Sequence, residues 1–172
     1  MNDRPMEPAK SLAVILLVGM VATPVSASPE IAVNLHQTPN AIAQNNASLS
    51  LGRAADLIDD WLRAKSRIFA PPFDRDTLAA LTTSRLYADT LEAIDYLLEN
   101  DGYYEYGVQK LESVERFAES GDRATIEVTI TEDVTFYQGG KVIESTFNTQ
   151  QVRYQLRFRD NLWKIADSQI LE

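Results

Sequence analysis

The spacing of apolar residues changes at Gly102 in this 172-residue chain, and that change limits the folds open to it. From Ser50 onward, apolar side chains recur at steps of three and four, which is typical of amphipathic helices. Over residues 124–131 and beyond, apolar and polar residues alternate, which is the period of a half-buried β-strand. The sequence therefore predicts an α+β fold in which helices come first and strands follow.

The helical part of the chain predicts three helices. Pro71-Pro72 ends the first, because proline disfavours a helical residue before it and lacks a backbone donor. Asp74 is placed to cap the second helix, and Thr83 or Ser84 to cap the third. The run Asn100-Asp101-Gly102 stops the third helix. The expected helices cover about residues 50–70, 74–81 and 84–99.

Two tight turns divide the second half of the chain into strands. Gly139-Gly140 predicts a two-residue hairpin turn, because both central positions of such a turn need positive φ. In the strand that follows, the apolar residues change parity between Phe147 and Val152. This change predicts a β-bulge within residues 148–151 and a sharply bent sheet there. Asp160-Asn161 predicts the second turn.

The second turn predicts how the last two strands pair. The residues expected to lie opposite each other on one face are Phe158 with Trp163, Leu156 with Ile165, and Tyr154 with Asp167. Trp61 and Trp163 are expected in the core. The whole pattern predicts about three helices packed on a strongly curved antiparallel sheet of four or more strands, which together form a cone.

The opposite face of the strand before Asp160 is basic. It carries Arg153, Arg157 and Arg159, and the expected bulge places Arg153 opposite Glu127. The simplest interpretation is a solvated outer face with ion pairs across the strands. An anion-binding role for these arginines stays open as the alternative.

Composition removes several classes of function. The chain has no cysteine and one histidine, so it forms no disulfide, thiolate metal site or multi-histidine metal site. Its net charge of −9 argues against nucleic acid or an anionic membrane surface as the main partner. No nucleophile elbow, phosphate loop or metal-ligand spacing is present, and we expect no cofactor.

The N-terminal residues resemble an export signal. Arg4 and Lys10 precede an apolar run that is too short to span a membrane as a helix, and Val25-Ser26-Ala27 forms a cleavage site. The polar residues after it read as a flexible linker that contains His36. We therefore expect a signal at 1–27, a linker at 28–49 and one domain at 50–172, with the periplasm or a thylakoid lumen as destination. An uncleaved signal anchor is the alternative.

Five short blocks, in order and over about 120 residues, resemble one known domain family. The family is the intermembrane-space (IMS) domain of the plastid-division "accumulation and replication of chloroplasts" proteins and their cyanobacterial relatives, which has a nuclear-transport-factor-2-like fold. The blocks are Asp60-Trp61-Leu62-Arg63-Ala64-Lys65, Asp101-Gly102-Tyr103-Tyr104-Glu105-Tyr106, Leu111-Glu112-Ser113-Val114-Glu115, Phe136-Tyr137-Gln138-Gly139-Gly140-Lys141 and Val152-Arg153-Tyr154-Gln155-Leu156.

The resemblance implies a non-catalytic module that docks the C-terminal tail of a protein partner. Aromatic side chains supply much of the energy at recognition surfaces, so the candidate binding residues are Tyr103, Tyr104, Tyr106 and Tyr137. A tail carboxylate would pair with one of the arginines of the basic face, Arg153, Arg157 or Arg159. The sequence leaves the oligomeric state and the partner's identity open.

A cone of this kind also suits an enzyme or a small-molecule binder, which is the alternative hypothesis. Related folds host isomerases and dehydratases that use a carboxylate beside a tyrosine inside an apolar cavity. The predicted pairing places Asp167 across from Tyr154 on the inner face. A buried aspartate in that position would be a candidate general base.

Overall fold

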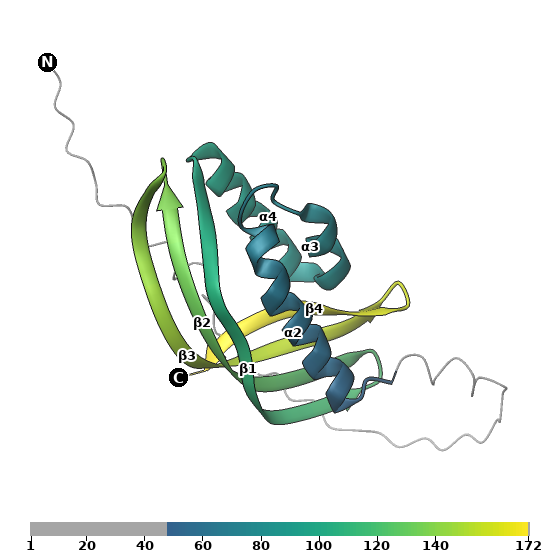
Figure 1. Ribbon diagram of the computed structural model, residues 1–172. Coiled ribbons are helices and arrows are strands. Elements are labelled where there is room, and N and C mark those ends of the chain that lie inside the picture. Colours follow the sequence, from purple (N-terminus) through teal and green to yellow (C-terminus); the bar gives the residue numbers. More distant parts are fainter. Residues whose placement is uncertain (1–47, 172) are drawn as a thin grey trace, which may run out of the picture.

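The computed structural model describes residues 48–171, which form three helices followed by four strands (Figure 1). The expected signal at 1–27 and nearly all of the expected linker lie outside the described residues. The α+β prediction is confirmed. The elements are α2 (Leu51–Ile68), α3 (Arg75–Leu81), α4 (Ser84–Glu99), β1 (Gly102–Ser120), β2 (Arg123–Gln138), β3 (Lys141–Arg159) and β4 (Leu162–Leu171).

Local signals set the ends of the helices. The Ser50 hydroxyl accepts a hydrogen bond from the Arg53 amide and begins α2, and the Asp74 carboxylate accepts one from the Thr77 amide at 2.9 Å and begins α3. Thr83 occupies the N-cap position of α4 but its side chain makes no capping hydrogen bond. After α4 the left-handed residue is Asp101, with φ of 50°.

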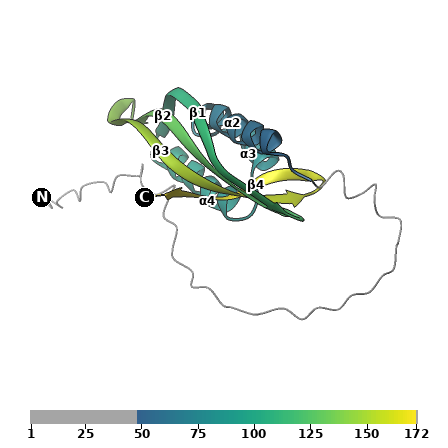
Figure 2. The ribbon, with the colours of Figure 1, turned by 90° about the horizontal axis from the view of Figure 1, so that it is seen from below.

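The four strands form one antiparallel sheet in the order β1-β2-β3-β4. The long strands bend, so the helices lie on the concave side of the sheet (Figures 1 and 2). Alternate residues of β2 point to this side and are buried, among them Ile126, Val128 and Ile130. Trp61 and Trp163 are 3% and 7% exposed, which confirms their predicted place in the core.

The bulge in β3 does not lie where the sequence predicts it. Pairing between β2 and β3 is continuous from Arg123–Arg157 to Phe136–Glu144, and the one register shift leaves Ile143 as the extra residue. The prediction of a bulge within residues 148–151 is therefore wrong. Its premise fails because Ile143 and Phe147 are 52% and 66% exposed, so their odd parity does not mark a buried face.

One bulge between the hairpin turn and Arg153 is enough to place Arg153 opposite Glu127, wherever the bulge lies. The structure confirms this pair: Arg153 Nη2 lies 2.8 Å from Glu127 Oε1. The two side chains face away from the helices.

The pairing of β3 with β4 is confirmed at one end and wrong at the other. Phe158 lies opposite Trp163 and Leu156 opposite Ile165, as predicted. A register shift then makes Ala166 an extra residue, so Tyr154 lies opposite Ser168 rather than Asp167. Asp167 lies opposite Gln155 instead, on the face of the sheet that points away from Tyr154.

Within residues 48–171, none of the helices is long and apolar enough to cross a membrane.

Candidate functional site

The tyrosines that follow α4 point to opposite faces of β1. Tyr104 is 5% exposed and packs on Phe136, with ring centroids 5.0 Å apart, and on Phe69 at 6.2 Å. Tyr106 packs on the same Phe69 ring at 6.3 Å. Burial raises the pKa of Tyr104 to about 12, so its hydroxyl stays protonated. Both side chains belong to the interior of the cone.

Tyr103 lies on the outer face, where it pairs with Tyr137 of β2. The two rings stack with centroids 4.8 Å apart and an angle of 2° between their planes. Val142 of β3 lies opposite Tyr137 and is 57% exposed, so one row of apolar side chains crosses three strands. Ile143 and Phe147 extend the exposed apolar surface along β3. We call these five residues the outer apolar patch.

The patch lies beside a strand edge that no described strand covers. β4 pairs with β3 only at residues 151–159 of β3. Residues 141–150 therefore have a neighbour only on the β2 side within the described part of the chain. In Figure 1 this stretch forms the outermost strand of the sheet. Such an edge presents backbone N–H and C=O groups to an incoming strand.

The candidate arginines lie beyond the patch along β3. Arg153 is 6 residues from Phe147, the nearest patch residue on that strand, and 11 from Val142, which corresponds to about 20 and about 35 Å of strand. Arg153 is paired with Glu127, and Arg159 Nη1 lies 2.9 Å from Asp122 Oδ2. Arg157 makes no ion pair within residues 48–171 and lies between Arg123 and Lys164 of the neighbouring strands. The structure therefore does not bring Arg153 or Arg157 together with Tyr103 and Tyr137.

A cavity of about 50 Å³ lies inside the cone, between α2 and the sheet. Lys65 of α2 and Glu132 of β2 form an ion pair there, with Nζ 2.6 Å from Oε1. The polar residues that line the cavity are Lys65, Tyr106, Glu132, Gln150, Tyr154 and Ser168. Asp167 is not among the lining residues, so the proposed Asp167–Tyr154 pair does not form.

Sequence reasoning missed the Lys65–Glu132 pair although a signal was present. Glu132 follows Ile126, Val128 and Ile130 at even positions of β2, so it occupies the face that points to the core. A carboxylate in that position needs a partner.

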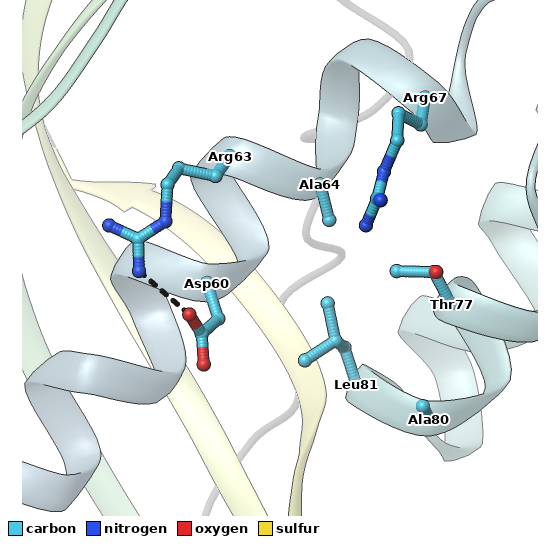
Figure 3. A pocket seen from close by; sticks show the side chains of 7 residues that line it. All are labelled: Asp60, Arg63, Ala64, Arg67, Thr77, Ala80 and Leu81. Atoms are coloured by element: carbon cyan, nitrogen blue, oxygen red, sulfur yellow. Dashed lines mark hydrogen bonds and ion pairs between the residues drawn. The ribbon is translucent and has the colours of Figure 1, made fainter.

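A second hollow, of about 530 Å³, lies at the surface between α2 and α3 (Figure 3). Ala64 and Leu81 form part of its apolar lining, and the Arg67 side chain extends toward Thr77. Arg63 is held by Asp59 and by Asp60, whose Oδ1 lies 2.7 Å from Nη2. In residues 48–171, no group of three or more Asp, Glu or His side chains is arranged to hold a metal ion.

Comparison with known families tests the resemblance found in the sequence. Residues 54–166 match the family model described as "ARC6-like, IMS domain", which is more than half of the chain. The chain belongs to the ARC6-like IMS domain family. The resemblance predicted from the five sequence blocks is therefore confirmed. A search of curated protein sequences gave no match.

Solved structures agree with the IMS assignment. The crystal structure of the intermembrane space region of the chloroplast protein ARC6 is similar, with a TM-score of 0.66 and 22% identity, over 72% of this chain and 98% of that one. Weaker likenesses include the Kfla4162 protein from Kribbella flavida, with a TM-score of 0.45 and 8% identity, over 67% of this chain and 85% of that one.

The IMS domain match includes the outer apolar patch and most of the cavity lining. The match ends at Ala166, so Ser168 of the cavity lies just beyond it.

Proposed function

We propose that this IMS domain is an exported, non-catalytic protein-interaction module that docks the C-terminal tail of a partner protein. By analogy with its family, the partner would belong to an envelope or division-related assembly, in the periplasm or a thylakoid lumen. The observation that carries the proposal is the outer apolar patch, where stacked Tyr103 and Tyr137 adjoin the exposed Val142.

The patch has the chemistry of a recognition surface. Val142, Ile143 and Phe147 are each more than half exposed, which is unusual for large apolar side chains grouped on one strand. The stacked tyrosines add rigid aromatic area that costs little entropy to order. These features support binding of a protein rather than a small polar solute.

The uncovered edge of β3 supports an extended segment as the bound form. Residues 141–150 offer backbone donors and acceptors directly beside the patch. A tail that adds to this edge as a strand would gain main-chain hydrogen bonds, and every second side chain would face the patch. This mode fits a chain end, because a free tail can extend without unfolding the partner.

The geometry of the cone supports the non-catalytic part of the proposal. The sequence suggested Asp167 with Tyr154 as an acid–base pair, and the bulge at Ala166 turns Asp167 away from Tyr154. The cavity carboxylate that is present, Glu132, is paired with Lys65 at 2.6 Å.

Capture of a partner from envelope extract tests the proposal. Three folded forms of residues 28–172 are compared: wild type, Tyr103→Ala with Tyr137→Ala, and a control with Leu98→Ala and Leu162→Ala, two leucines that are 52% and 57% exposed elsewhere. We expect wild type and control to retain the same partner and the patch variant to bind at least about tenfold more weakly.

The captured partner is then produced without its C-terminal tail. Loss of binding by the shortened partner is the expected result. The proposal fails if the patch variant binds as well as the control, or if the shortened partner still binds.

A further inference from the structure

The cavity inside the cone contains polar groups that the proposed docking function does not use. Lys65 and Glu132 have side chains only 14% and 11% exposed, and their ion pair leaves the cavity without net charge. Gln109 Nε2 donates a second hydrogen bond to the same carboxylate oxygen, Glu132 Oε1, at 3.3 Å. The pair therefore fixes one oxygen of Glu132 and leaves the other, Oε2, for another donor.

Five polar residues that line this cavity have side-chain groups with no hydrogen-bond partner within residues 48–171. The groups are Glu132 Oε2, the hydroxyl groups of Tyr106, Tyr154 and Ser168, and the side-chain amide of Gln150. Tyr154 is 2% exposed as a residue, and its hydroxyl opens onto the cavity instead of being sealed inside the protein. Burial, followed by the nearby charge of Glu132, raises the pKa of both tyrosines, so both hydroxyls are donors. The cavity thus offers both donors and acceptors, among them the two tyrosine hydroxyls and the Glu132 carboxylate oxygen.

Charge and size narrow the class of ligand that fits these groups. An anion would lie against Glu132 and a cation against Lys65, and neither charge would find an unpaired counter-charge. A volume of about 50 Å³ has room for only a few non-hydrogen atoms. Trp61, Ile130 and Val152 form an apolar wall beside the polar groups.

We propose that this cavity is a binding site for a small neutral molecule that carries both a hydrogen-bond acceptor and a donor, of which a primary carboxamide is the simplest. Its carbonyl oxygen would accept from Tyr154 and Tyr106, its N–H would donate to Glu132 Oε2, and its alkyl end would contact the apolar wall. The site is separate from the outer apolar patch and goes beyond the docking function.

Titration by ¹H–¹⁵N NMR with three probes of similar size tests this site. The probes are acetamide, acetate and ethylammonium, each at the same ionic strength. The Trp61 indole N–H is the reporter, distinguished from that of Trp163 by a Trp163→Phe sample. We expect acetamide to shift the Trp61 signal saturably, with a millimolar dissociation constant, and to leave the Trp163 signal in place. Acetate and ethylammonium should give no saturable shift.

Single-atom variants link the binding to the hydroxyl groups. Tyr154→Phe and Tyr106→Phe each remove one donor without changing the shape of the cavity, and each should weaken acetamide binding about fivefold. Tyr96→Phe removes a hydroxyl from an exposed tyrosine of α4 that does not line the cavity, and it should leave the affinity unchanged. Using two cavity variants keeps the test open if one of them folds poorly.

The proposal is overturned by any of three results. These are the absence of a saturable shift with acetamide, equal affinity for all three probes, or unchanged acetamide affinity in both cavity variants.

Discussion

At the scale of single residues, the ion pair between Lys65 and Glu132 joins α2 to the sheet across the interior of the cone. Both side chains are mostly buried, and Lys65 Nζ also lies 5.8 Å from the centre of the Trp61 ring. A buried pair of this kind adds little net stability compared with apolar residues of the same size. Removal of one partner is different, because it leaves a buried charge uncompensated.

We expect Glu132→Leu to lower the free energy of unfolding by about 3–5 kcal/mol, because Lys65 then has no counter-charge. The double variant Lys65→Met with Glu132→Leu should recover most of this loss. Lys110→Met, which breaks an exposed pair with Glu112, serves as the control and should change little. Urea unfolding measures all three. If the single and the double variant lose the same free energy of unfolding, the uncompensated charge of Lys65 is not the cause of the destabilisation.

Two glycines should respond to alanine with opposite signs. A Cβ at Gly107 would lie 2.5 Å from Asp133 Oδ2, so Gly107→Ala should destabilise the fold by about 1–3 kcal/mol. Gly52 lies in α2 with no atom within 4 Å of a Cβ, so Gly52→Ala should stabilise it by about 0.5–1 kcal/mol. Thermal unfolding compares the two. A gain in stability for Gly107→Ala would contradict the packing described.

At the scale of helices and strands, periodicity predicted the elements but not every face. The three helices and both turns follow from local signals such as Asp74 and Gly139-Gly140, which act over a few residues. The two strand errors share one cause, because a bulge is set by packing between strands and leaves little trace in one strand's sequence. The bulge was predicted in the wrong place because Ile143 was counted as a buried-face residue, although it is exposed.

The candidate binding tyrosines lie on two different faces of the sheet for a related reason. Consecutive residues of a strand point to opposite faces, so Tyr103 and Tyr104 were never able to share one surface. The sequence identified the aromatic junction correctly as a region, and only the pairing of β1 with β2 shows which tyrosines face outward. The sequence does not identify Ile143 and Phe147 as surface residues, because alternating apolar residues of a strand are typical of its buried face.

The cap of α3 predicts a pH effect on stability. The Thr77 hydroxyl, and then its amide, donates to Asp74 and lowers the pKa of that carboxyl below its usual value. The unfolded chain therefore binds the proton more readily, and the stabilisation is present above the unfolded pKa and is lost as pH falls through the folded pKa.

Asp74→Ala should lower the melting temperature by a few degrees at neutral pH, and the difference from wild type should shrink as the pH falls. Asp74→Ser keeps a neutral capping oxygen, so its melting temperature should depend less on acid than that of wild type. A constant difference between Asp74→Ala and wild type from neutral to strongly acidic pH would contradict this role.

At the scale of the whole molecule, the curved sheet separates two kinds of surface. Its concave side holds the helices (Figure 1) and the Lys65–Glu132 cavity. Its outer side carries Tyr103, Tyr137 and Val142 beside a strand edge that no described strand covers. Because the sheet lies between them, an alteration on one side can be made without repacking the other. The proposed docking of a partner on the outer side would therefore leave the packing of the interior unchanged.

Site-specific photo-crosslinking in living cells tests the docking function most directly. A photoreactive amino acid replaces Val142 in the outer apolar patch or, as a matched control, the exposed Leu98 of α4. We predict an adduct from position 142 whose partner-derived peptide comes from the partner's C-terminal tail, and no such adduct from position 98. Equal adducts from both positions, or a peptide from elsewhere in the partner, would contradict docking of a tail at this patch.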